Sequence, residues 1–213
     1  MEFSDLVELV KDQPLFDSGL LLSGDVSPGY IRRQLSSWID AGKIIQLRRG
    51  LYVLASPFQK TSPHPFQVAN CFKQPSYVSY QSALAYYGLI PEGVYTTVSA
   101  TTRRPGKWVT ALGTFQYHHV LPNWFSDYIS LDLGGQQSAF IASPEKALLD
   151  LVFLTSQGDS PSFLDELRLQ NLEGIDLSKM EVIVKRAGKP KLARFFVHFQ
   201  QLVQQQAKGN RRL

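Results

Sequence analysis

The sequence contains very little cysteine. Cys71 is the single cysteine in 213 residues, so no disulfide can form within the chain, which fits a reducing compartment. Long apolar runs are also missing, because no segment approaches the roughly 20 consecutive apolar residues of a membrane-spanning helix. Acids at Glu2, Asp5 and Glu8 argue against a secretory signal peptide. We therefore expect a cytoplasmic protein that has no membrane partner.

The spacing patterns of common metal, nucleotide and catalytic sites are missing as well. No Gly-rich phosphate loop occurs, and one cysteine with four histidines gives no zinc-ligand spacing. His118 and His119 are adjacent, so on a strand they point to opposite faces and cannot hold one ion together. Ser143 and Lys146 match the Ser-x-x-Lys pattern of some hydrolases, but Ser143 stands where a helix N-cap is needed. We expect no catalytic residue, no metal and no cofactor, and therefore no enzyme.

The composition is that of a soluble globular chain with an uneven distribution of charge. Hydrophobic residues make up 44% of the sequence and charged residues 19%, with a formal net charge of +4. Basic residues gather in two zones, one within residues 32–49 and one near the C-terminus. The distribution of basic residues along the chain is therefore more informative about binding partners than the net charge is.

The stretch from Ser27 to Gly42 has the pattern of a capped amphipathic helix. Ser27 precedes a proline, which is a typical helix start, and Gly42 is a typical helix end. Ile31, Leu35 and Trp38 follow at helical spacing and form one apolar stripe. The opposite face is polar and carries arginine, so the helix has a side available for a partner.

A short basic hairpin is predicted directly after this helix. Residues 43–54 read as two strands that turn near Arg49-Gly50, and residues 32–49 carry five bases against one acid. A polar helix followed by a basic hairpin is typical of a winged helix-turn-helix, whose helix enters the major groove while the wing lies on phosphates. Two shorter helices before Ser27 complete the unit. Its expected core centre consists of Leu35, Trp38, Leu51 and Val53.

Three prolines within residues 55–65 indicate an extended linker. We therefore divide the chain into a winged helix-turn-helix domain, residues 1–56, and a larger mixed α/β domain that ends in helices, residues 57–213. The predicted fold class is α+β. Serine–proline pairs at 143–144 and 160–161 predict two further capped helices in the larger domain.

The candidate DNA-binding residues lie on the predicted helix and hairpin. Arginine can donate two hydrogen bonds to guanine, and serine can contact a base or a phosphate, so Arg33, Ser36 and Ser37 are candidates for base edges. Phosphate contacts supply affinity without sequence information. The complete candidate set is Tyr30, Arg32, Arg33, Ser36, Ser37, Lys43, Arg48 and Arg49.

Two other groups of bases offer a possible second basic surface. The first is expected in a hairpin-like loop, and the second surrounds the start of the last helix. Either group could meet DNA or an acidic partner, or could be an ordinary solvated surface. These residues are Arg103, Arg104, Lys107, Lys185, Arg186, Lys189, Lys191 and Arg194.

Three stretches of the sequence, in order and with matching spacing, resemble the AbiEi family of antitoxins and transcriptional regulators from AbiE-type toxin–antitoxin operons. They are residues 47–54 (LRRGLYVL), residues 77–89 (beginning YVSYQSAL and ending Gly-Leu) and residues 142–151 (ASPEKALLDL). The resemblance covers roughly residues 3–155. The first stretch looks like the wing of that family's winged helix.

The resemblance implies a bacterial antitoxin that represses its own operon. Its winged helix would bind inverted repeats of double-stranded DNA in its promoter, and its larger domain would counteract a nucleotidyltransferase-like toxin. Two alternatives from other classes stay open. One is a toxin-binding inhibitor without DNA binding. The other is an enzyme carried by the α/β domain, which a deep pocket lined by acids or histidines within residues 66–155 would favour.

Overall fold

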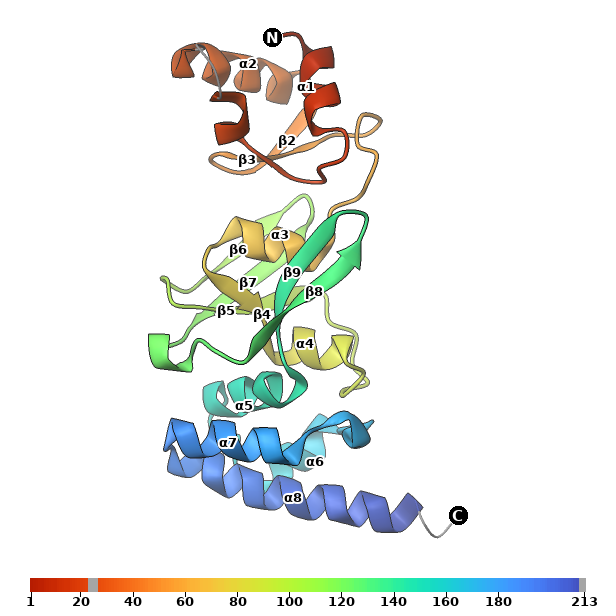
Figure 1. The fold of residues 1–213 in the computed structure, drawn as a ribbon, viewed down its shortest axis with the longest axis vertical. Helices are drawn as coiled ribbons and strands as arrows, with labels where there is room; N and C mark the ends of the chain where they lie inside the picture. Colours follow the sequence, from red (N-terminus) through yellow and green to blue (C-terminus); the bar gives the residue numbers. More distant parts are fainter. Residues whose placement is uncertain (23–26, 211–213) are drawn as a thin grey trace.

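The computed structural model describes residues 1–22 and 27–210, and Figure 1 shows an elongated molecule with its elements stacked along the long axis. The described residues form eight α-helices and two β-sheets. Helices α1 and α2 lie at one end, followed by a three-stranded sheet, a six-stranded sheet and a layer of C-terminal helices. The chain is therefore a mixed α/β protein, in agreement with the predicted α+β class.

The N-terminal unit is built from helices and a small antiparallel sheet. Its apolar core includes Leu6, Val10, Ile31, Leu35 and Trp38. The predicted helix is α2, and its Ser27 cap is confirmed because the Ser27 side chain accepts a hydrogen bond from the Tyr30 amide. Its elements are α1 (Phe3–Val10), β1 (Phe16–Asp17), the 3-10 helix η1 (Ser18–Leu22), α2 (Pro28–Asp40), β2 (Ile44–Arg48) and β3 (Leu51–Leu54), with strand order β1-β3-β2.

Strand β3 is buried on both of its faces. Tyr52 and Leu54 pack into the core formed with α1 and α2. Leu51 and Val53 pack instead into the core of the larger unit, although we predicted them at the centre of the N-terminal core. Adjacent strand residues point to opposite faces, so an uninterrupted apolar strand fits a position between two layers. The small sheet thus separates α1 and α2 from the larger unit and contacts both (Figure 1).

The larger unit is organised around a sheet with the strand order β6-β7-β5-β4-β9-β8. Helix α3 (Pro65–Phe72) precedes the sheet, and the His64 side chain caps it by accepting a hydrogen bond from the Phe66 amide. The Gln137 side chain binds the linker by accepting from the His64 amide and donating to the Ser62 carbonyl. The strands are β4 (Ser76–Val78), β5 (Thr96–Thr101), β6 (Gly106–Thr110), β7 (Gly113–His119), β8 (Tyr128–Gly134) and β9 (Gln137–Ala142).

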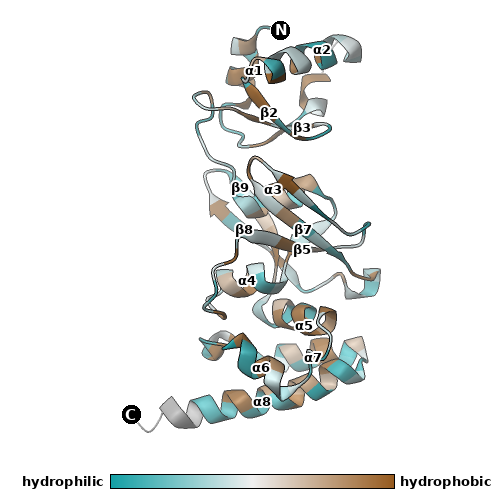
Figure 2. Ribbon diagram, turned by 180° about the vertical axis from the view of Figure 1, so that it is seen from behind, coloured by the Kyte–Doolittle hydropathy of each residue, from teal (hydrophilic) through white to brown (hydrophobic). Residues whose placement is uncertain are grey.

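Helices cover the far end of the molecule. Ser143 and Ser160 cap α5 and α6 as their serine–proline pairs predicted. Figure 2 shows α5 as a largely hydrophobic helix between the six-stranded sheet and α7 and α8. No helix in residues 1–22 and 27–210 is both long enough and apolar enough to cross a bilayer. The remaining elements are α4 (Tyr80–Tyr86), η2 (Pro122–Trp124), α5 (Pro144–Leu154), α6 (Pro161–Leu167), η3 (Leu172–Gly174), α7 (Leu177–Ala187) and α8 (Pro190–Asn210).

Candidate nucleic-acid interface

The outer face of α2 is open to solvent. Helix α2 lies at the end of the molecule farthest from the larger sheet, and residues 27–30, Arg32, Arg33, Ser36 and Ser37 are exposed (Figure 1). The Tyr30 hydroxyl accepts hydrogen bonds from the N-terminal ammonium group and from the Gln34 side chain. Tyr30 therefore stiffens the edge of α2 next to α1, and its hydroxyl can still donate.

A groove of about 350 Å³ runs between η1, α2 and the β2–β3 hairpin. Arg32 and Ser36 line it from α2, and Gln46 and Arg49 line it from the hairpin. Arg33 and Ser37 are not among its lining residues and belong to the outer face of α2 instead. The structure thus joins Arg32, Ser36 and Arg49 on one concave surface.

The hairpin turn is short and tightly held. Gly50 has a φ of +85°, a conformation that residues with a Cβ rarely adopt. Its carbonyl oxygen accepts a hydrogen bond of 2.9 Å from the Ser18 amide, which attaches the turn to η1. The position of Arg49 relative to α2 is therefore set by backbone contacts rather than by a loose loop.

Arg48 does not point to solvent as a phosphate ligand would. Its guanidinium donates to the Phe72 carbonyl at 2.8 Å, to the Cys71 carbonyl at 3.1 Å and to the Arg49 carbonyl at 2.9 Å. The first two acceptors belong to the last turn of α3, whose carbonyl groups lack a partner within the helix and favour a nearby cation. We therefore correct the prediction for Arg48, which joins the hairpin to the larger unit.

Lys43 also lies outside the candidate surface. It stands at the open end of the hairpin, six residues before Arg49, and a rise of about 3.3 Å per residue separates the two by about 20 Å. Its ammonium group lies 4.8 Å from the centre of the Phe3 ring, in a cation–π contact with α1. The structure thus places Lys43 with α1 and not with Arg49.

Within residues 103–107, Arg104 and Lys107 lie on different sides of β6. Their segment joins β5 to β6, which flank β7 on opposite sides, so it is not the hairpin-like loop that we expected. The Lys73 ammonium group donates to the Arg104 carbonyl at 2.6 Å and lies 4.3 Å from the Trp108 ring. Lys107 precedes Trp108 on β6, so its side chain points to the opposite face from Lys73.

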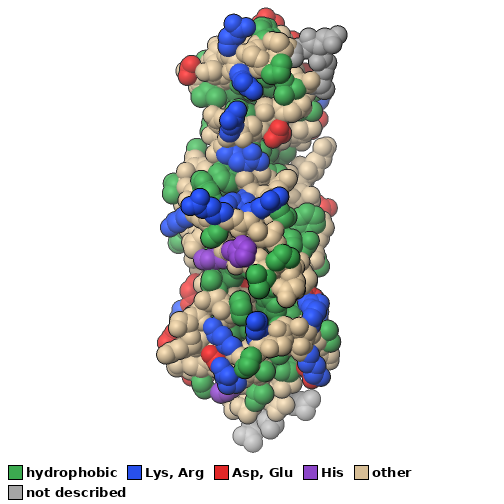
Figure 3. All heavy atoms as spheres, turned by 90° about the vertical axis from the view of Figure 1, so that its left-hand side faces the viewer, with side chains coloured by type: hydrophobic (Ala, Val, Ile, Leu, Met, Phe, Trp, Pro, Cys, Tyr) green, Lys and Arg blue, Asp and Glu red, His purple; other side chains and the backbone are tan. Residues whose placement is uncertain are grey.

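A chain of contacts continues the positive surface from the hairpin onto the larger unit. Arg48 binds the end of α3, the next residue is Lys73, and Lys73 binds the Arg104 carbonyl. Burial, with a smaller effect from nearby Arg104, lowers the pKa of Lys73. Figure 3 shows Lys and Arg side chains following one another along the long axis on this side. We define the basic stripe as Arg32, Arg49, Lys73, Arg103 and Arg104.

The C-terminal bases are mostly paired with acids or carbonyl groups. Lys185 pairs with Glu181 at 2.6 Å, Arg194 with Asp159 at 2.8 Å, and Arg186 with Asp127. The Lys191 ammonium group donates to the Phe153 and Thr155 carbonyl groups. Lys189, which lines a pocket with Arg186, forms no ion pair within residues 1–22 and 27–210.

The exposed arginines of the stripe, and Arg33 on the outer face of α2, form no such ion pairs with the residues that the structure describes. None of Arg32, Arg33, Arg49, Arg103 and Arg104 pairs with a carboxylate in the described part of the chain. Unpaired cations on one side give the field that attracts a polyanion, whereas paired ones largely cancel. The contrast favours the stripe and the α2 face over the C-terminal bases.

The stretch of residues 142–151 contains a buried ion pair. Lys146 and Asp150 are paired one helical turn apart, and their side chains are completely buried. Asp150 also accepts hydrogen bonds from Ser79 at 2.6 Å and Trp124 at 2.6 Å, and Tyr77 lies within reach of both charges. Burial lowers the pKa of Lys146, while Asp150 opposes that shift. The sequence carried one signal for this pair, an i, i+4 spacing of opposite charges inside an apolar helix.

No metal-binding constellation is found in the described residues, since no group of three or more His, Cys, Asp and Glu side chains there could hold an ion. His118 is half-buried beside Tyr80, and burial lowers its pKa. His119 is exposed, as expected for neighbours on a strand.

Comparison with known proteins adds no family assignment: no model of a known protein family matches the sequence, and no curated protein matches it.

Proposed function

We propose that this chain is a bacterial antitoxin and transcriptional autorepressor that binds inverted repeats in its own promoter through a winged helix. The element order α1-β1-η1-α2-β2-β3 with sheet order β1-β3-β2 supports this interpretation. In it, α2 is the recognition helix, the β2–β3 hairpin is the wing, and residues 1–56 are the DNA-binding domain of the cytoplasmic protein. Short η1 stands where such domains have their second helix.

One observation carries the DNA-binding proposal. Arg32 and Arg49 line the same groove from α2 and the hairpin, and neither pairs with an acid in the described residues. Arg33, Ser36 and Ser37 extend from the exposed side of α2, where they would meet base edges and nearby phosphates. Arg49 and Arg32 would hold the backbone.

The basic stripe would lengthen the contact with DNA beyond the winged helix. Arg33 and the four arginines of the stripe would neutralise about five phosphates, since the Lys73 ammonium is already bonded to the Arg104 carbonyl. This predicts a slope of roughly −4.5 for the logarithm of affinity against the logarithm of salt concentration. A salt slope near −3 would confine DNA to α2 and the hairpin.

The DNA-binding test uses the full-length protein and the DNA upstream of its own operon. Arg32→Ala combined with Arg49→Ala is expected to weaken binding at least tenfold and to reduce the salt slope by about 2. Lys185→Ala combined with Arg194→Ala removes two bases that are already paired, and it should leave both values unchanged. Equal binding by the first variant and the wild type would reject the assignment of this surface.

The antitoxin activity rests on the resemblance of residues 3–155 to the AbiEi family. The expected partner is a nucleotidyltransferase-like toxin encoded next to this chain. Co-expression should restore growth to cells that carry the toxin. If the wild-type protein restores growth but does not bind DNA, the result would support the alternative, a toxin inhibitor without repressor activity. Failure to rescue growth would reject the antitoxin activity while leaving DNA binding intact.

A further inference from the structure

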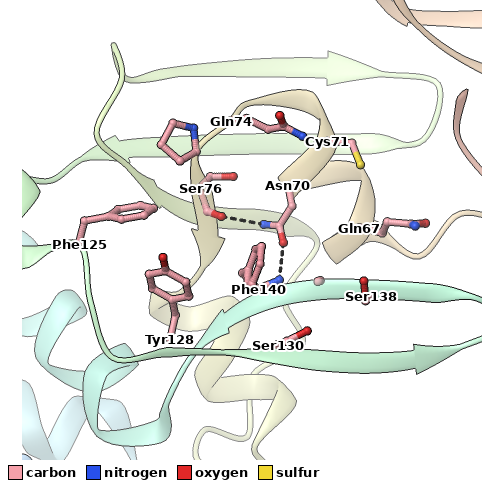
Figure 4. A pocket seen from close by; sticks show the side chains of 12 residues that line it. Gln67, Asn70, Cys71, Gln74, Ser76, Phe125, Tyr128, Ser130, Ser138 and Phe140 are labelled. Atoms are coloured by element: carbon pink, nitrogen blue, oxygen red, sulfur yellow. Dashed lines mark hydrogen bonds between the residues drawn. The ribbon is translucent and has the colours of Figure 1, made fainter. Parts of the chain in front are cut away.

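A pocket of about 470 Å³ opens beside α3 on the six-stranded sheet, and the proposed DNA interface does not use it (Figure 4). It lies between α3, the start of β4 and the strands β8 and β9. The pairing of β4 with β9 is parallel and is restricted to Val78 opposite Ile141. The two strands therefore separate towards Ser76, which leaves room for the pocket.

The Asn70 side chain spans this separation. Its amide nitrogen donates to the Ser76 carbonyl at 3.4 Å, and its oxygen accepts from the Phe140 amide at 2.5 Å (Figure 4). These main-chain groups would otherwise need partners from a neighbouring strand. The Asn70 side chain thus takes the place of a neighbouring strand, and its two hydrogen bonds hold the wall of the pocket in place.

The two ends of the pocket differ in chemistry. Figure 4 shows Phe125 and Tyr128 at one end and Gln67 and Ser138 at the other. The Tyr128 ring lies 5.2 Å from the Phe125 ring and 5.5 Å from the Phe140 ring, measured between centres. Tyr128 is 36% exposed and Phe140 48%, so their rings are accessible to a ligand. One end therefore offers stacking and the other offers hydrogen bonds.

Two residues that line this pocket each carry a buried polar atom without a hydrogen-bond partner in the described part of the chain. The Ser76 hydroxyl and the Gln67 side-chain oxygen make no hydrogen bond within the described residues, although Ser76 is only 5% exposed. Leaving such atoms unpaired is unfavourable, and unpaired groups in a native fold call for an explanation. Each atom exposes less than 1 Å², so a ligand would satisfy both after rotation of the Gln67 and Ser76 side chains towards the pocket.

The pocket has no charge to offer a ligand. None of its twelve lining residues, all of them described, is acidic, basic or histidine. A phosphate or carboxylate would lose its water without gaining a cation. The pocket also lacks the acids and histidines that would have favoured an enzyme.

We propose that this pocket binds an uncharged small molecule with a planar aromatic ring at one end and a hydroxyl-bearing tail at the other, the chemistry shared by nucleosides and aryl glycosides. The ring stacks among Tyr128, Phe125 and Phe140. The tail hydroxyl groups donate to Gln67 and bond with Ser76. This site is independent of DNA binding and would exist even if the proposed repressor activity were wrong.

The test is calorimetric titration of the full-length protein, without DNA, using adenosine, phenyl β-D-glucoside and adenosine 5′-monophosphate. At least one of the two uncharged probes is expected to bind with a Kd of about 1 mM or lower. Saturation by adenosine alone assigns the site to nucleosides, and saturation by the glucoside alone assigns it to aryl glycosides. Adenosine 5′-monophosphate should bind at least tenfold more weakly than adenosine if adenosine binds.

Matched variants connect the binding to this pocket. Phe140→Ala should weaken the bound probe about tenfold through lost stacking, whereas Phe153→Ala, an equally exposed phenylalanine outside the pocket, should not. Gln67→Leu should weaken it at least fivefold, with Gln201→Leu on α8 as the control. Thermal melting verifies that each variant is folded.

Three results would overturn the proposal. The first is that neither uncharged probe saturates at about 10 mM. The second is that Phe140→Ala and Gln67→Leu bind as the wild type does. The third is that the monophosphate binds as tightly as adenosine, which would contradict the requirement for an uncharged ligand.

Discussion

The Arg48 side chain donates a 2.8 Å hydrogen bond to the main-chain oxygen of Phe72, and this contact joins the β2–β3 hairpin to the end of α3. A second bond, to the Cys71 carbonyl, pairs another acceptor of the same helix end. Neighbouring arginines on one hairpin therefore have different tasks. Arg48 holds the two units together, while Arg49 lines the groove beside α2.

The first prediction separates these two arginines. Arg48→Met should lower the free energy of unfolding by about 1–3 kcal/mol, because partly buried carbonyl groups lose a charged donor. Arg49→Ala should change stability by less than about 0.5 kcal/mol but should weaken DNA binding. Urea denaturation and DNA titration of both variants measure the two effects. Equal losses of stability in the two variants would contradict the distinction.

The second prediction concerns the buried pair of Lys146 and Asp150. Lys146→Met should destabilise the protein by about 3–5 kcal/mol, because it leaves the Asp150 carboxylate buried without its cation. Lys185→Met is the matched control, since Lys185 also pairs with an acid one helical turn away but is exposed. That change should remain below about 1 kcal/mol. Chemical denaturation measures both, and a loss under 1 kcal/mol for Lys146→Met would refute the structural role.

The third prediction tests how far the DNA contact extends. Arg103→Ala combined with Arg104→Ala should reduce the salt slope of DNA affinity by about 2, because each lost phosphate contact retains roughly one counterion. Lys107→Ala is the control from the same segment, since Lys107 points away from the face of β6 on which Trp108 contacts Lys73. An unchanged slope in the double variant would restrict the interface to the winged helix.

The fourth prediction is an acid sensitivity caused by His64. Burial lowers the pKa of His64, whose Nδ1 accepts the Phe66 amide bond only when unprotonated. The unfolded chain takes up this proton near its ordinary pKa of about 6.5, while the folded chain does so at lower pH. The unfolded state thus binds more protons in that interval, and stability falls as pH decreases from about 6.5 through the folded pKa.

His64→Asn should reduce this loss, because asparagine keeps a cap acceptor and does not titrate. The comparison is the difference in urea midpoint between pH 7 and pH 5 for the variant and the wild type. Carboxylates and His118, whose pKa burial also lowers, contribute equally to both proteins. Identical differences for the two proteins would exclude His64 as a cause.

The fifth prediction is that residues 1–56 do not fold alone. Leu47, Leu51 and Val53 pack into the core of the larger unit, so the fragment would expose the apolar face of its sheet. We expect broad amide resonances or aggregation by NMR and light scattering. A cooperative thermal transition in the isolated fragment would show that the predicted boundary also divides two independent folding units.

Local signals in the sequence were sufficient for much of the N-terminal unit. The serine–proline pairs located the starts of α2, α5 and α6, because a capping serine and a first-turn proline act within a few residues. The hairpin turn followed from Arg49-Gly50, since the positive φ there favours glycine. The exposed face of α2 followed from the spacing of its apolar residues.

Long-range relationships were not accessible in the same way. Arg48 looks like any other base until α3, more than 20 residues later, places its carbonyl groups beside it. Leu51 and Val53 read as core residues, but alternation along a strand does not say which core each face meets. Likewise, the C-terminal bases look like a basic patch in the sequence. Their partners Asp127 and Asp159 come from distant segments, so the sequence does not show that Arg186 and Arg194 are paired.

The two-faced burial of β3 has a consequence for how such proteins can be recombined. A chimera that joined residues 1–56 of this chain to the remainder of a related one would place its junction next to a shared apolar core. It would replace the residues that pack against Leu51 and Val53. The chimera would fold only if the core of the new larger unit had room for Leu51 and Val53. If α2 is the recognition helix that we propose, exchanging its exposed side alone would transfer operator choice and leave the contacts of Leu51 and Val53 unchanged.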